Sequence, residues 1–196
     1  AILAAGTLGA LAYAFSDTFW FSAVEGEVYA TSSLFTAAVF WAMLRWYDEA
    51  DGPHANRWIV LIFYLMGLSI GVHLLNLLTL PVLVLLWYFR KYQVTGKGVT
   101  YAVILSFLML GVLNFLFIPG VAKVAGWFEL FFVNTVGLPY NSGMYIYLLL
   151  FVGLIVFGIW YSLKKNRVVL NWVLTVVAVL MLGYSSFALI IIRANA

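Results

Sequence analysis

The sequence predicts an all-α polytopic membrane protein, and three features of the chain lead to this fold class. Its 196 residues are 66% hydrophobic and only 9% charged, with a mean hydropathy of +1.08. A soluble domain of this length cannot bury so much apolar surface, so its solvent must be lipid. The apolar residues also form separate runs, each close to the roughly 20 residues that cross a bilayer. We expect residues 1–196 to form a single transmembrane domain.

Seven apolar runs predict about seven transmembrane helices. They cover residues 1–16, 29–47, 58–73, 75–90, 99–118, 143–162 and 168–192. The third and fourth runs are short and are joined by a tight turn around His73. Pro81 lies inside the fourth run and is expected to kink it, because proline cannot donate a helical hydrogen bond.

The segment between the fifth and sixth runs, residues 119–142, has a pattern of its own. Pro119 and Gly120 are expected to end the fifth helix. Residues 121–133 then predict a short amphipathic helix on the extracytoplasmic membrane surface, anchored by Trp127, Phe128, Phe131 and Phe132. Glu129, which lies among these aromatic residues, is expected to be solvated.

Basic residues are distributed unevenly among the predicted loops. Alternating helices place eight of the ten on one side of the membrane, in the segments 45–57, 90–98 and 163–168. Only Lys123 and Arg193 lie on the other side. The positive-inside rule makes the side with eight basic residues cytoplasmic, so residues 17–28 and 119–142 are expected to face outward.

Several classes of protein are excluded. The chain has no cysteine, so it has neither a disulfide framework nor a thiolate metal site. Its scattered basic residues do not form a nucleic-acid-binding face, and motifs of soluble nucleotide or hydrolase chemistry are absent. Because the chain opens directly in an apolar run, without an initiator Met, we expect an internal piece of a larger protein. A first outward loop is then expected upstream and an exported region downstream.

Three carboxylates lie together in the first outward segment: Asp17, Glu25 and Glu27. Acidic side chains this close to hydrocarbon usually face a water-filled cavity or a partner. If residues 22–33 extend the second helix outward, Glu25 shares a face with Tyr29, and Glu27 points about 200° away from Glu25. One glutamate is then a general base or metal ligand and the other a substrate contact. Alternatively both only favour a helix dipole, and Asp17 is more typical of a solvated loop.

His73 and Asn76 lie at the outward turn between the third and fourth runs. Because lipid offers no hydrogen-bond partner, we expect both to line the same outward cavity as Glu27. There His73 donates to an anionic ligand with help from Asn76. The alternative is a packing histidine bonded to a backbone carbonyl. Lys123 and Arg193 either bind phosphate at the outer face or only extend to the interface.

Four stretches of the chain carry a family resemblance. They read FWFSAVEGEVYATSS at residues 19–33, GLSIGVHLLN at 67–76, YSSF at 184–187 and RANA at 193–196. Together they resemble a bacterial multi-span family related to the eukaryotic protein O-mannosyltransferases, which belongs to the GT-C class of glycosyltransferases. The resemblance covers nearly the whole chain and implies a GT-C-like fold in the bacterial inner (cytoplasmic) membrane.

The resemblance also implies an activity: transfer of a sugar from a polyprenyl-phosphate donor to an extracytoplasmic acceptor, such as a protein Ser or Thr hydroxyl. It implies Glu27 as the preferred base beside Glu25, with a principal catalytic acid upstream of this chain. Around these glutamates we expect the substrate contacts His73, Asn76, Tyr29, Asp17, Lys123 and Arg193. The cofactor is left open, with a divalent cation as a candidate, and no nucleic acid is expected as a partner. The alternative function is a transporter or a non-catalytic membrane module.

Overall fold

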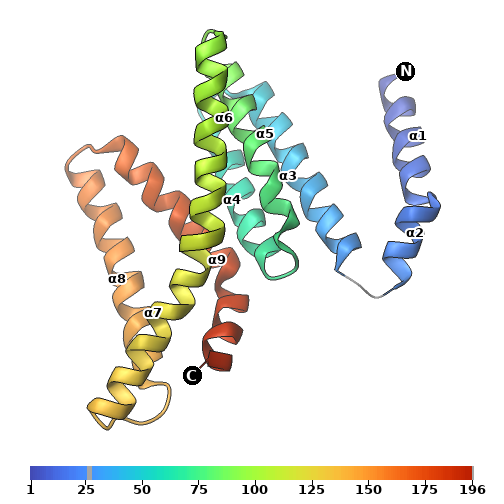
Figure 1. Cartoon of the computed structure of the whole chain (residues 1–196). Helices are drawn as coiled ribbons and strands as arrows, with labels where there is room; N and C mark the ends of the chain where they lie inside the picture. Colours follow the sequence, from blue (N-terminus) through green and yellow to red (C-terminus); the bar gives the residue numbers. More distant parts are fainter. Residues whose placement is uncertain (26–27, 196) are drawn as a thin grey trace.

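The computed structural model of the chain describes residues 1–25 and 28–195, with the backbone alone for Ser186 and residues 188–195. Every regular element in this described part is helical and no strand occurs there, which confirms the predicted all-α class. The helices run up and down between two ends of the molecule (Figure 1).

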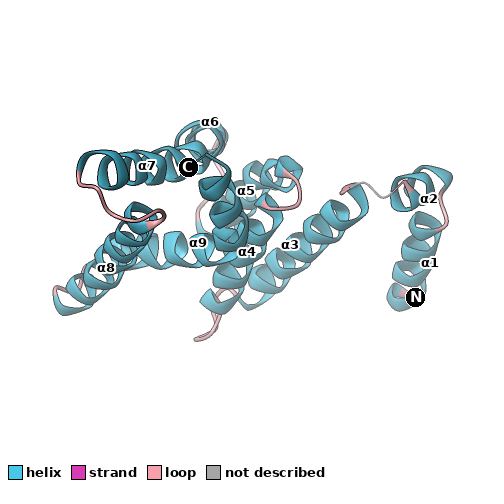
Figure 2. Cartoon of the chain, turned by 90° about the horizontal axis from the view of Figure 1, so that it is seen from below, coloured by secondary structure: helices cyan, strands magenta, loops and turns pink. Residues whose placement is uncertain are grey.

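Two helices at the N-terminus stand apart from the rest of the bundle (Figures 1 and 2). Neither α1 (Ile2–Ala14) nor α2 (Asp17–Val24) contains a buried residue. Their axes are inclined by 56°, and the Ser16 hydroxyl at the break accepts a hydrogen bond from the Phe19 amide and caps α2. Residues 17–28 were predicted as an outward segment without a separate helix, so α2 is an element that the prediction missed.

An antiparallel pair, α3 (Tyr29–Glu49) and α4 (Asn56–Ile70), contributes the largest share of the main hydrophobic core. A 3-10 segment, η1 (Leu74–Thr79), follows and leads directly into α5 (Leu80–Lys91). Pro81 lies in the first turn of α5, where its missing N–H has no helical partner to lose. Instead of the kink that was predicted inside the fourth apolar run, the structure has a transition from 3-10 helix to α-helix at the start of α5.

The longest helical path runs over 40 residues, from Gly96 to Thr135. It comprises α6 (Gly96–Gly111), the π-helical η2 (Val112–Phe117), α7 (Ile118–Leu130) and the π-helical η3 (Phe131–Thr135). The prediction that Pro119 ends the fifth helix was wrong. A π-helical turn accommodates residues that do not fit the regular hydrogen-bond ladder, and η2 ends two positions before the proline, which lies in the first turn of α7. The separate surface helix predicted over 121–133 is likewise part of this continuous path.

The last two helices, α8 (Ser142–Lys164) and α9 (Val168–Asn195), return through the bundle. α7 and α8 form an antiparallel hairpin, whereas α9 packs most extensively against α4. The backbones of α4 and α9 approach closely at Gly67 and Gly183, because a Cβ on either glycine would collide with backbone atoms of the other helix. Such glycine contacts are a common way for membrane helices to pack.

Within the described part of the chain, four helical stretches are long and apolar enough to cross a membrane: Leu74–Lys91, Gly96–Thr135, Ser142–Lys164 and Val168–Ser185. The bent pair of α1 and α2 makes a fifth if it counts as one span. These helices indicate a multi-pass membrane protein. α4 has only 15 residues, fewer than the roughly 20 that a crossing needs, and α3 is not among the four. The number of seven spans therefore stays a prediction.

The segments predicted as cytoplasmic and those predicted as outward lie at opposite ends of the molecule (Figure 1). The α3–α4, α5–α6 and α8–α9 connections, which carry the eight basic residues, lie toward the upper end of Figure 1. The end of α2, the start of α3 and the α4–η1 turn lie toward the lower end. This arrangement is the one that alternating spans require. Which end is cytoplasmic stays a prediction.

Candidate functional site

The chain changes direction at His73, between α4 and η1. The backbone there is extended (φ −162°, ψ 136°), and the ring Nδ1 accepts a hydrogen bond from the Leu75 amide at 3.0 Å. The half-buried ring therefore caps η1 and satisfies an amide that has no carbonyl partner within the helix. When one nitrogen of a neutral imidazole accepts, the other carries the proton. Nε2 of His73 is therefore the donor that remains for a ligand.

Tyr29, the first residue of α3, lies against His73. The two ring centroids are 5.5 Å apart and the ring planes are inclined by 49°. α3 and η1 also pack against each other. The contact thus joins two segments that are 44 positions apart in the sequence and that were predicted as site segments for separate reasons. Tyr29 and His73 define the candidate site at the lower end of Figure 1.

The acidic residues of the first outward segment are placed only in part. Glu25 is exposed and forms the C-cap of α2, whereas α3 begins at Tyr29. Residues 22–33 therefore do not form one helix, which was the condition under which Glu25 and Tyr29 were expected to share a face. Asp17 is also exposed and opens α2 at the end of that helix away from Glu25. Glu27, the preferred base, lies outside the described residues.

A group of buried polar side chains lies next to His73. Asn76 is 0% exposed, and its Nδ2 donates to the Ser69 hydroxyl at 2.9 Å. The Ser69 hydroxyl donates in turn to the Met66 carbonyl at 2.8 Å. Asn76 therefore fastens η1 to α4. Its burial does not fit the expectation that it lines an outward cavity, and its Oδ1, like the buried Ser32 hydroxyl, has no hydrogen-bond partner among the described residues.

The predicted outward cations lie on other helices. Lys123 is exposed on α7, whose main partners outside its own helical path are α8 and α9 rather than α3 or η1. The structure therefore does not bring Lys123 into the group around Tyr29 and His73. Arg193 belongs to α9, and its side chain lies outside the described residues.

Glu129 is a buried carboxylate with a structural task that sequence reasoning missed. It is 3% exposed, and its two oxygens accept hydrogen bonds from the Asn141 amide at 2.5 Å and the Met144 amide at 2.9 Å. These amides open α8, where Asn141 (φ 68°) makes no side-chain cap of its own. Glu129 from α7 therefore caps α8 and places negative charge at its N-terminus. The expectation of a solvated Glu129 was wrong.

The other end of the molecule carries a compact set of ion pairs. The Glu49 carboxylate accepts from the Trp58 indole at 2.9 Å and from Arg57 and Arg45 at 2.8 Å. The hydrogen bond from Trp58, followed by the bond and charge of Arg57, holds the pKa of Glu49 below its ordinary value. Asp51 pairs with Arg90 and Lys91, and its pKa is lowered in the same way, mainly by Arg90.

No three His, Asp or Glu side chains lie close enough to hold a metal ion within the residues that the structure describes. The chemical groups that the candidate site does offer are an exposed phenol at Tyr29 and an imidazole donor at His73, and the exposed carboxylate of Glu25 lies four positions before Tyr29 in the sequence. These groups suit acid–base chemistry next to an anionic ligand.

A family match covers the part of the chain that contains this site. Residues 1–96 match the family described as protein O-mannosyl-transferase TMEM260 N-terminal domain. The match takes in both Tyr29 and His73 and supports an O-mannosyltransferase-related family, with a glycosyltransferase-like function. No curated protein matches the chain, and no solved structure does.

Proposed function

We propose that the protein is a membrane glycosyltransferase of the GT-C type in the bacterial cytoplasmic membrane. It transfers a sugar from a polyprenyl-phosphate donor to an extracytoplasmic acceptor, such as a protein Ser or Thr hydroxyl. The observation that carries this proposal is the contact between Tyr29 and His73. It joins the two longest stretches of the family resemblance at one end of the bundle, within the residues 1–96 that match the O-mannosyl-transferase family.

The proposed reaction needs a base for the acceptor and a stabilising group for the leaving phosphate. A carboxylate of the Glu25–Glu27 segment takes the proton from the acceptor hydroxyl. The acceptor oxygen bonds to the anomeric carbon of the sugar, and the bond from that carbon to the phosphate oxygen breaks. Polyprenyl phosphate leaves with the bonding electrons, and the proton stays on the carboxylate.

His73 suits the stabilising role because its hydrogen bonding fixes the position of its proton. Nδ1 accepts from the Leu75 amide, so Nε2 carries the proton of the neutral ring. A hydrogen-bond donor that is already in position beside the phosphate, where negative charge develops, lowers the barrier to sugar transfer. The Tyr29 ring packs against the imidazole and limits its rotation.

Substitution of the glutamates in the full-length protein tests the proposal. With a polyprenyl-phosphate sugar and an acceptor peptide in proteoliposomes, Glu27→Gln should lower turnover by about 100-fold or more, because the amide cannot accept the proton. Glu25→Gln should have a smaller effect. The control is Asp48→Asn, an equivalent change at an exposed acid at the other end of the molecule, and it should leave turnover unchanged.

Thermal unfolding of each variant separates chemistry from folding. Full turnover in both glutamate variants would contradict the proposed base and leave the pair as helix-dipole acids. The absence of both sugar transfer and solute flux in the parent protein would favour the non-catalytic membrane module. A solute flux across the proteoliposome membrane that disappears in Glu27→Gln, without any sugar transfer by the parent protein, favours the transporter.

A further inference from the structure

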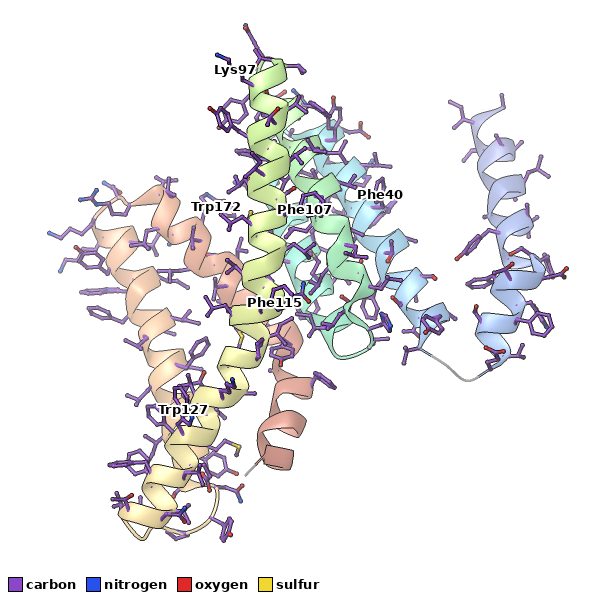
Figure 3. The ribbon with its side chains drawn as sticks, in the orientation of Figure 1. Phe40, Lys97, Phe107, Phe115, Trp127 and Trp172 are labelled. Carbon is purple, nitrogen blue, oxygen red and sulfur yellow. The ribbon has the colours of Figure 1, made fainter. Side chains whose placement is uncertain are left out.

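An apolar groove lies between α4, α5, α6 and α9, away from Tyr29 and His73. Its larger part has a volume of about 720 Å³, and its lining is almost entirely hydrophobic. A smaller hollow of about 270 Å³ adjoins it and shares the residues Ile59, Phe63, Trp87 and Met109. The opposite wall is formed by α9, where Trp172 lies toward α6 (Figure 3).

The crossing of α4 and α9 closes the groove at its inner end. Leu180, the last α9 residue that lines the groove, packs its carbonyl against Gly67 at this crossing. Asn56, the first α4 residue in the lining, precedes Gly67 by eleven positions, which is about 16 Å of helix. The hydrocarbon core of a bilayer is about 30 Å thick. The groove is therefore about as deep as one leaflet.

The end of the groove away from the α4–α9 crossing lies beside the basic segments. Asn56 is followed by Arg57, and on the opposite wall Trp172 comes five positions after Arg167, or just over one helical turn. Trp87 and Trp172 line this part of the groove, and tryptophan is enriched where membrane helices meet lipid headgroups. The three connections here carry eight basic residues against three acidic ones. This excess of positive charge favours an anionic headgroup.

We propose that the groove binds one acyl chain of an anionic phospholipid from the leaflet at the basic end, with the lipid phosphate between Arg57 and Arg167. The chain fills a hollow that opens to hydrocarbon and matches it in depth. The sugar donor of the proposed function is a different lipid, because its phosphate must reach Tyr29 and His73 at the opposite end. The phospholipid is thus a resident ligand whose binding does not depend on sugar transfer.

Native mass spectrometry of the full-length protein tests this site. After delipidation in detergent, the protein is supplied with phosphatidylglycerol or phosphatidylcholine of identical acyl chains. We expect one retained phosphatidylglycerol per protein and much less phosphatidylcholine. Val176→Trp fills the groove and should abolish retention. The control is Leu149→Trp, because Leu149 on α8 is 75% exposed and does not line the groove; this variant should retain the lipid as the parent protein does.

Arg167→Gln tests the headgroup contact while leaving the groove lining intact, so a folding defect in Val176→Trp cannot obscure the result. Loss of one arginine contact should weaken phosphatidylglycerol binding by about fivefold and leave phosphatidylcholine unaffected. Lys165→Gln, which removes a charge outside the groove mouth, should have a smaller effect. The proposal is overturned if the two lipids bind equally or if Leu149→Trp loses the lipid as Val176→Trp does. It is also overturned if the protein retains an isoprenoid lipid instead, or retains no lipid.

Discussion

His73 combines two tasks in one ring, and its two nitrogens divide them. Nδ1 holds the Leu75 amide and so sets the start of η1. Nε2 carries the N–H group that, in the proposed mechanism, donates a hydrogen bond to the phosphate of the sugar donor. An asparagine can perform the first task, because its side-chain oxygen accepts from the amide two residues later. It cannot reach the position of Nε2.

The pair of variants His73→Asn and His73→Ala is therefore expected to separate capping from catalysis. Both should weaken binding of the sugar donor by about 10-fold or more, the value of a hydrogen bond to a charged group. Only His73→Ala should also lower the melting temperature, because it removes the cap at a cost of about 1 kcal/mol. Donor affinity and thermal unfolding are the two measurements. Normal donor affinity in His73→Asn means that the ring only caps η1.

Glu129 is expected to matter for stability and not for chemistry. In Glu129→Gln one carboxylate oxygen becomes an NH₂ group that faces a backbone N–H of α8, so one hydrogen bond is lost and the helix start loses its negative charge. We expect a loss of about 2 kcal/mol in stability, measured by thermal unfolding in detergent. Asp48→Asn, an exposed acid, is the matched control and should have no effect.

Among the candidate site residues, the choice of His73 rests on the cost of a polar side chain in lipid. His73 is unusual next to hydrocarbon on any topology, so its selection did not depend on the helix boundaries. Asn76 and Glu129 were misjudged because their partners come from other turns: Asn76 bonds Ser69 on α4, and Glu129 bonds amides 12 and 15 positions later. Neither pairing has a local signal in the sequence.

At the scale of helices, the α4–α9 crossing shows how glycine sets the architecture. A Cβ at Gly67 would lie on the Leu180 carbonyl, whereas a Cβ at Gly153, on α8, meets nothing within 4 Å. Gly67→Ala should therefore lower stability by about 1–3 kcal/mol, as overpacking does. Gly153→Ala should be neutral or slightly stabilising, because alanine favours helix more than glycine does.

Thermal unfolding of the two alanine variants under identical conditions checks this difference. The result also bears on the lipid groove, because the same crossing closes its inner end. If Gly67→Ala is as stable as Gly153→Ala, the two helices are not in the close contact that the structure gives them.

The order of the helices follows from hydropathy, but their breaks do not. The apolar runs predicted α3 and α8 to within a few residues, since length and composition decide where a chain enters lipid. α2 was missed because its start depends on a local cap by Ser16. The break at Pro119 was wrong because a π-helical turn absorbs the proline, and hydrophobic periodicity does not reveal such turns.

The molecule as a whole must fit a helical path of 40 residues, about 60 Å long, into a bilayer with a core of about 30 Å. One end of this path lies at Lys97 (Figure 3), among the basic connections, and the other leads into the α7–α8 hairpin. The path therefore extends beyond the hydrocarbon at one or both ends, or it lies strongly tilted. Its π-helical segments allow a change of direction.

The orientation of the molecule can be tested directly, because the chain has no cysteine of its own. Single cysteines at Ser22 and Asn134 should react with a membrane-impermeant maleimide on intact cells, because both lie at the end that has few basic residues. Cysteines at His54 and Gln93 should react only after the membrane is opened, since the positive-inside rule keeps their loops in the cytoplasm. The opposite pattern inverts the orientation and removes the outward site from the proposed function. Labelling at Asn134 without labelling at Ser22 means that α1 and α2 do not complete a crossing, so the number of spans changes while the orientation of the α7–α8 hairpin is retained.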